Sequence, residues 1–150
     1  MIHKRRLKNE MDAEFDRASS LRKDGKTVEA YQLFAKLASE GYSPSLVEMA
    51  QNARAQGNIA DAARYLAQLE ELAERKDDSL ACVMCAMAYH ANLGTQDFLE
   101  QMALSVKYYR YAAELGAPDA QGTIAINMLH GHNGHAKDEA QYLYWIDKAI

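Results

Sequence analysis

The sequence predicts an all-α protein built from about four stacked helix pairs, and three observations lead to that prediction. Ala, Leu, Glu, Lys, Gln and Met, most of which favour helix, are plentiful in the 150 residues, whereas runs dense in Val, Ile and Thr are absent. The chain also repeats itself in steps of 35 and 40 residues, a range typical of helix-pair arrays. Helix-stopping glycines and helix-capping residues alternate along the chain at the spacing that such pairs require.

The repeat is found by laying the chain on itself. Segment 37–45 matches segment 112–120 at an offset of 75 residues, and Leu72-Ala73 matches Leu37-Ala38 at an offset of 35, which leaves a second step of 40. Each pair has an apolar stripe that it cannot bury alone, so stacked copies bury the stripes as one core. Small residues in shared register are expected to let helices approach closely: Ala30, Ala38, Ala50, Ala73, Ala113, Ala125 and Ala149. Larger residues that share one register are expected to fill the gaps: Phe34, Leu69, Tyr109 and Ile146.

Start and stop signals place eight helices in chain order. The stop signals are Asp24-Gly25, Gly41, Gly57, Gly94, Gly116 and Gly131. The start signals are Thr27 as an N-cap, Pro44, Asp61, Asp77-Asp78-Ser79, Thr95 or Asp97, Pro118 and Asp138 as a cap. The expected helices span residues 8–23, 27–40, 45–57, 61–76, 79–94, 97–116, 118–131 and 138–150.

Composition and charge narrow the class of protein. No Pro- or Ser-rich linker divides the chain, so residues 1–150 are expected to form one domain. The formal net charge is −4, but residues 1–8 carry +4 and the remainder −8, and an acidic body argues against a broad nucleic-acid surface. We expect the basic start to be a frayed, solvated terminus. No apolar run reaches the length of a membrane span and no signal-peptide core follows the basic start, so a cytoplasmic protein without membrane contact is expected.

The C-terminal third carries a family pattern. Asp138 is followed by Tyr142, Trp145-Ile146 and Lys148-Ala149-Ile150, and the preceding copy reads Ser105, Tyr108-Tyr109, Tyr111-Ala112-Ala113 and Gly116 before Pro118-Asp119-Ala120. On these residues the chain resembles Sel1-like repeats, which are related to the tetratricopeptide repeat. The resemblance extends over residues 30–55 and departs from the pattern over 61–93, where Lys76 replaces the repeat-ending glycine. It implies a right-handed α-solenoid that serves as an adaptor or scaffold, without a fixed ligand.

The resemblance also implies that the first helix of each pair lines a concave face. Equivalent positions on these helices form a predicted partner-binding stripe: Glu48, Asn52, Met87, His90, Asn127 and His130. Asn can hydrogen-bond a peptide backbone through both its donor and its acceptor, and Met adapts to irregular apolar groups. The alternative is that several of these side chains pack against the neighbouring helix.

Two further clusters have a chemical and a structural interpretation. His130, His132 and His135 crowd one loop beside Asp138 and are candidate zinc or nickel ligands, or simply polar loop residues. Cys82 and Cys85 form a CxxC, which is a redox or zinc signal, but Cys85 falls on the small-residue register of Ala50 and favours packing. No cofactor is expected.

The aromatic residues divide in the same way. Tyr108, Tyr109 and Trp145 fit the packing register of the repeat, whereas Tyr111 and Tyr144 fit it less well and are candidates for surface contact. Aromatic side chains near Arg110 could stack nucleic-acid bases, but packing is the favoured interpretation.

Taken as a sequence, the chain is expected to bind another protein rather than to catalyse a reaction. No nucleophile elbow, phosphate-binding loop or HExxH motif occurs. The alternatives are an immunity protein or chaperone that masks a single toxin or effector, and a metal- or redox-dependent regulator. No polar capping helix follows Ile150, so either the natural chain continues or a partner or a second copy covers this end, and we predict self-association through the C-terminal helix pair.

Overall fold

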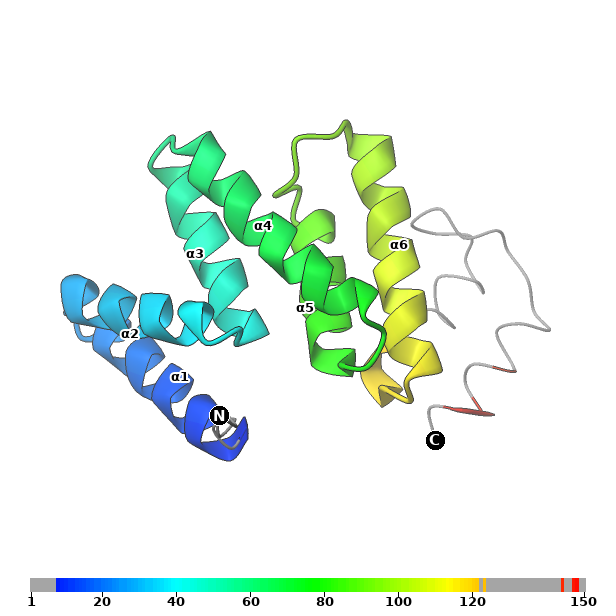
Figure 1. Ribbon diagram of the computed structural model, residues 1–150, viewed down its shortest axis with the longest axis horizontal. Helices are drawn as coiled ribbons and strands as arrows, with labels where there is room; N and C mark the ends of the chain where they lie inside the picture. The colour runs from blue at the N-terminus through cyan, green and yellow to red at the C-terminus, as the bar shows by residue number, and fades with distance from the viewer. Residues whose placement is uncertain (1–7, 122, 124–143, 145–146, 149–150) are drawn as a thin grey trace, which may run out of the picture.

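The computed structural model describes residues 8–121, 123, 144, 147 and 148, and this part of the chain is helical without a strand. Its helices are α1 (Lys8–Lys23), α2 (Thr27–Ser39), α3 (Ser43–Ala55), α4 (Ile59–Glu74), α5 (Ser79–His90) and α6 (Phe98–Glu114). Consecutive helices pack as antiparallel pairs, α1 with α2, α3 with α4 and α5 with α6, as Figure 1 shows. The all-α prediction and the pairing are thus confirmed for the described residues. Residues 118–121 are again helical, after the predicted start at Pro118.

Most helices end in the same way. At the end of α2, Gly41 has φ +81° and its N–H donates to the Ala38 carbonyl at 3.0 Å, while the Tyr42 N–H donates to the Leu37 carbonyl at 3.0 Å. This paired arrangement satisfies carbonyls that the helix leaves open and requires a left-handed residue, which glycine provides without steric cost. The same pair of backbone bonds ends α1, α3, α5 and α6.

Two helix ends depart from the glycine rule. At the end of α4, Lys76 has φ +56°, so a lysine adopts the left-handed conformation that glycine supplies elsewhere. Its Nζ lies 4.3 Å from the centre of the Tyr111 ring, a cation–π contact that offsets part of the backbone cost. The predicted stop at Gly94 is wrong, because α5 ends at His90 and Asn92 takes the left-handed conformation with φ +63°.

The helix starts confirm two of the predicted caps and correct one. Asp78 accepts a hydrogen bond from the Ala81 N–H at 3.2 Å, and Asp97 accepts one from the Glu100 N–H at 2.8 Å, as predicted. Thr27 is already inside α2, whose N-cap residue makes no side-chain capping bond. The helix expected to start near Asp61 begins at Ile59, and its cap is Asn58, whose Oδ1 accepts a hydrogen bond from the Asp61 N–H at 3.1 Å.

Side-chain contacts show that the first helices of the three pairs run in the same direction. Tyr42, just before α3, donates its hydroxyl hydrogen to Asp12 near the start of α1, and Glu48 within α3 pairs with Arg22 near the end of α1. At the far end of α3, Arg54 Nη1 donates to the Asn92 carbonyl just after α5 at 2.6 Å. The pair α3–α4 lies between the pairs α1–α2 and α5–α6 (Figure 1).

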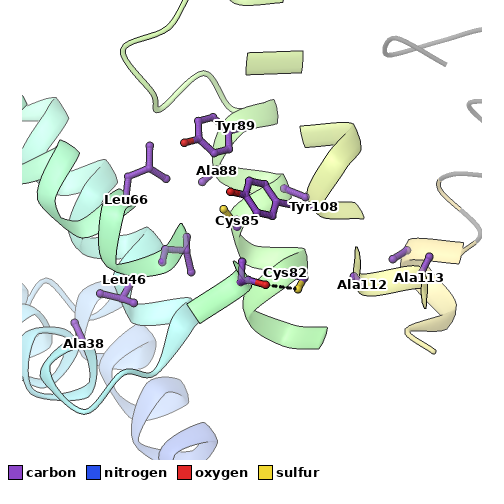
Figure 2. Close-up of a cluster of buried hydrophobic side chains, with 14 residues drawn as sticks. Ala38, Leu46, Leu66, Cys82, Cys85, Ala88, Tyr89, Tyr108, Ala112 and Ala113 are labelled. Carbon is purple, nitrogen blue, oxygen red and sulfur yellow. Dashed lines mark hydrogen bonds between the residues drawn. The ribbon is translucent and has the colours of Figure 1, made fainter. Parts of the chain in front are cut away.

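The core has two parts. A small cluster of Ala18, Ala30 and Phe34 joins α1 to α2, and a larger cluster extends from Ala38 of α2 through α3, α4, α5 and α6 to Ala120 (Figure 2). The alanines predicted to allow close approach are buried wherever the structure describes them: Ala30, Ala38, Ala50, Ala73 and Ala113. Ala125, Ala149 and Ile146 lie outside the described residues.

The larger residues of the predicted register are buried with one exception. Phe34 and Leu69 are at most 1% exposed, as expected for residues that fill the gaps between helices. Tyr109 is only half-buried, and its neighbour Tyr108 fills the core instead, with 1% of its surface exposed. The α6 residue that fills the core is therefore one position earlier than the repeat register predicts.

Buried hydroxyl groups link this core to acidic residues at its edge. The Tyr89 and Tyr108 rings lie near each other in the core (Figure 2) and stack with their centres 6.0 Å apart, and Tyr89 donates its hydroxyl hydrogen to Glu70. Tyr108 donates to Glu74 Oε1 at 2.9 Å, and Lys107 Nζ lies 2.6 Å from the same oxygen. The Lys107 ammonium and the Tyr108 hydroxyl both lower the pKa of Glu74.

Candidate partner-binding site

The described part of the predicted stripe lies on α3 and α5, which pack against each other. Most of α5 is buried, but Met87 is 47% exposed and His90, three residues later on the same side of the helix, is also exposed. Asn52 on α3 is half-buried. These three side chains, which come from two neighbouring helices, are therefore accessible to a partner.

Glu48, the fourth described member of the stripe, has a structural partner. Its Oε2 lies 2.5 Å from Arg22 Nη1, and the Glu48 side chain is 20% exposed. The hydrogen bond that Arg22 donates to Glu48 raises the pKa of Arg22, whose guanidinium also lies 5.2 Å from the centre of the Phe34 ring. Glu48 thus has a structural role, because its ion pair joins α1 to α3.

The remaining members of the stripe, Asn127 and His130, lie outside the described residues. So do His132 and His135, the other candidate metal ligands of the histidine loop. Within the part of the chain that the structure describes, no group of three His, Cys, Asp or Glu side chains is placed to hold a metal ion.

The CxxC pair lies in the core rather than at an accessible surface. Cys82 and Cys85 are both fully buried, and the Cys82 thiol donates to the Ala73 carbonyl at 3.5 Å (Figure 2). Burial, with help from Asp78, raises the pKa of Cys82 to about 11, and burial also raises the pKa of Cys85. Redox-active thiols need a lowered pKa and access, so this environment supports the packing interpretation.

The two tyrosines predicted for surface contact differ. Tyr111 is half-buried and packs edge-on against Tyr108, with their ring centres 5.7 Å apart, while two lysine ammonium groups approach its ring. Tyr144 is 51% exposed, and Lys148 Nζ lies 5.5 Å from its ring centre. Of the two, Tyr144 is the more accessible.

Sequence reasoning missed a cleft at the end of the molecule where α4 and α6 begin. Its volume is about 370 Å³, towards the lower end of the range of about 300–1,000 Å³ that is usual for ligand sites. We call this site the α4–α6 cleft. Its lining residues come from the end of α3, the first turns of α4 and α6, and the connection between α5 and α6: Arg54, Ile59, Ala62, Ala63, Asn92, Leu93, Gly94, Thr95, Gln96, Phe98 and Gln101.

The connection that forms one wall of the cleft, residues 91–97, is held by hydrogen bonds to side chains, of which the one from the Gly94 N–H is buried. Gln101 is 2% exposed, and its Oε1 accepts from the Gly94 N–H at 2.7 Å, while its Nε2 donates to Asn92 Oδ1 and to the Gln96 carbonyl. From the other side, Arg54 Nη1 donates to the carbonyls of Asn92 and Gly94. The 91–97 loop is therefore fixed, although it is the longest connection between the described helices.

Gly94 is needed in this loop for close approach rather than for a left-handed backbone. A Cβ atom at this position would lie 2.9 Å from Tyr89 Cε1 and 3.0 Å from Gln101 Oε1. Both distances are shorter than ordinary van der Waals contacts, so any larger residue would displace the packing around the loop.

The sequence did contain a signal for this loop. The repeat steps are 35 and then 40 residues, and the five extra residues fall between Met84 and Tyr109. This interval contains the 91–97 loop, whose seven residues compare with three residues between α3 and α4. An insertion in a repeat marks a place where the array departs from simple stacking, so the longer step indicated the position of the cleft.

Comparison with protein-family models gives no match for the chain, and comparison with curated proteins gives none either. Its class is therefore defined by architecture, as an all-helical protein of paired helices. Among the described residues, no helix combines the length and the apolar character needed to cross a membrane.

Proposed function

We propose that the protein is a non-catalytic protein-interaction module, an adaptor or scaffold of the Sel1-like type with a right-handed α-solenoid arrangement. The observation that carries this proposal is the exposure of Met87 and His90 on α5, a helix that is otherwise largely buried, beside Asn52 on α3. These residues are part of the stripe expected on the concave face, and they combine an adaptable apolar group with hydrogen-bonding groups.

Two further features support the proposal. The parallel first helices α1, α3 and α5 are the arrangement that a stack of like-oriented pairs requires. The sequence carries no motif of known catalytic chemistry, and its two thiols are placed in the core. Neither feature depends on the stripe itself.

The test is affinity capture with matched variants. The bait is the full chain as wild type, as M87S/H90A on α5, and as V28S/Q32A, which removes an apolar and a polar exposed side chain one turn apart on α2. We expect wild type and the α2 variant to retain the same binding partners at stoichiometric levels, and the α5 variant to lose them. Partners that bind all three baits equally, or no partner at all, would contradict the proposal.

The number of partners then distinguishes the forms of this function. One stoichiometric partner that is inactivated or kept folded in the complex indicates an immunity protein or a chaperone. Several partners that share dependence on Met87 and His90 indicate an adaptor or scaffold. Self-association is measured separately, by light scattering of the purified chain.

A further inference from the structure

The α4–α6 cleft is surrounded by exposed apolar side chains. Ile59, the first residue of α4, is 52% exposed, and Phe98, the first residue of α6, is 63% exposed. Both line the cleft together with Leu93, and Leu99 beside Phe98 is 77% exposed. Large apolar groups that gather around a concavity are typical of an interaction site, whereas single exposed ones are ordinary.

The cleft is also preformed. Gln101 and Arg54 fix the 91–97 loop from opposite sides, and α4 and α6 supply the other walls from their first turns. A binding partner would therefore lose little free energy in ordering this wall on association. The α3–α4 turn and the 91–97 loop lie at the same end of the molecule (Figure 1).

The charge of the cleft favours an anionic group in the ligand. Arg54 is the one charged residue among those that line it, and within the described part of the chain no carboxylate pairs with its guanidinium. The helices α4 and α6 both begin at the cleft, and the electrostatic potential at the N-terminus of a helix is positive. The neighbouring Asp97 uses one carboxylate oxygen to cap α6, and Asp61 pairs with Arg64 at 3.2 Å.

We propose that the α4–α6 cleft binds a partner-protein segment in which an apolar side chain lies next to an Asp or Glu side chain. The apolar group enters between Ile59, Leu93 and Phe98, and the carboxylate pairs with Arg54. A guanidinium fork is suited to this role because it can donate two parallel hydrogen bonds to one carboxylate. This surface is separate from the stripe on α3 and α5, and it rests on the proposed function only in that the partner is a protein.

The binding experiment uses defined peptide pools and fluorescence anisotropy. Each fluorescein-labelled decapeptide pool has a fixed central pair, Leu-Glu, Leu-Gln, Leu-Lys or Ser-Glu, with degenerate flanking positions and an amidated C-terminus. We expect the Leu-Glu pool to bind at least about tenfold more tightly than the other three, and its affinity to fall as salt concentration rises. A fifth pool with Leu-Gln and a free C-terminal carboxylate tests the alternative source of the charge. Equal binding of the Leu-Glu and Leu-Gln pools, no binding, or preference for the fifth pool would overturn the proposal.

Variants assign the binding to the cleft. Phe98→Ser should weaken the Leu-Glu pool about tenfold or more, whereas Val28→Ser, which changes an exposed apolar residue in the first turn of α2, should leave it unchanged. Arg54→Gln should remove the preference for Glu over Gln, and Arg54→Lys should restore part of it because the positive charge remains. Thermal unfolding of each variant shows that it is folded under the assay conditions.

Two results separate this proposal from the proposed function. M87S/H90A should bind the Leu-Glu pool as wild type does, because the stripe is not part of the cleft. If that variant loses the peptide and Phe98→Ser does not, peptide binding belongs to the stripe and the cleft proposal fails while the proposed function stands. Light scattering that shows a dimer of wild type but a monomer of Phe98→Ser would mean that a second copy covers the cleft, which also overturns the proposal.

Discussion

Replacing Gln101 by Met tests whether the 91–97 loop is held in the way the structure indicates. The substitution keeps a side chain of similar length and volume but removes the three hydrogen bonds that Gln101 makes to the loop. The Asn92 side chain is exposed and can turn to water, whereas the Gly94 N–H is buried and loses its acceptor. The effect should therefore be dominated by one unsatisfied backbone donor.

The expected magnitude follows from these contacts. An orphaned buried N–H costs about 1–3 kcal/mol, and two further hydrogen bonds contribute about 0.5–1.5 kcal/mol each, part of which water recovers. We expect Gln101→Met to lower the free energy of unfolding by about 2–4 kcal/mol, which corresponds to a Tm lower by roughly 4–16 °C in a chain of this size. Urea unfolding followed by circular dichroism measures the loss.

Gln68→Met is the matched control, because Gln68 is an exposed helical residue of α4. Its effect should stay within about 0.5 kcal/mol of wild type. Hydrogen exchange adds a local measurement, since the Gly94 amide should lose its protection in Gln101→Met. A variant as stable as the control, with the Gly94 amide still protected, would show that the loop does not depend on Gln101.

Four further predictions concern the core and its edge. Ala113 is 1% exposed in α6, so Ala113→Leu should cost about 1–3 kcal/mol in urea unfolding through overpacking, whereas Ala103→Leu on the exposed side of α6 should cost little. Because burial raises the pKa of Cys82 from about 9 to about 11, the unfolded chain releases this proton first, and stability should fall as pH rises through this interval. At pH 8, a thiol reagent should label Cys82 and Cys85 only when urea unfolds the chain; rapid labelling of the native protein would contradict their burial. Glu74 has a lowered pKa, so its stabilising effect is present above its usual value of 4.5 and is lost as pH falls; Glu74→Gln should reduce the difference between urea midpoints at pH 7 and pH 3.

Local signals in the sequence predicted most of the fold because they act over few residues. The stop at Gly41 depends on one backbone conformation, and the cap at Asp78 depends on one hydrogen bond three residues away, so both can be read without tertiary contacts. The end of α5 was misplaced because Asn92 can also adopt the left-handed conformation, and Gly94, two residues later, is required for a different reason. Propensity alone does not separate these two roles of a small residue.

The candidate site was less predictable because it depends on contacts between distant segments. Glu48 and Asn52 lie one turn apart on α3, yet Glu48 pairs with Arg22 from another helix pair and Asn52 does not, and no periodicity in the sequence distinguishes them. The α4–α6 cleft likewise requires Arg54 to reach the backbone of a loop about 40 residues further along the chain. Helical periodicity identifies the faces of a helix but not the loops that close over them.

The lengthened repeat step gives the cleft its physical origin. If the second step were 35 residues, α6 would follow α5 after a short turn like those that end α1, α2 and α3, and Ile59 would be expected to face the neighbouring helix pair. The longer 91–97 loop instead passes beside the start of α4 and needs its own hydrogen-bond partners, which the buried Gln101 and the exposed Arg54 supply. An ordinary surface loop satisfies its backbone hydrogen-bonding groups with water. It would not require a buried glutamine that makes three hydrogen bonds. The arrangement is that of a wall fixed in place, with Phe98 and Ile59 exposed at its edge, which distinguishes the cleft from the exposed helix faces elsewhere in the described chain.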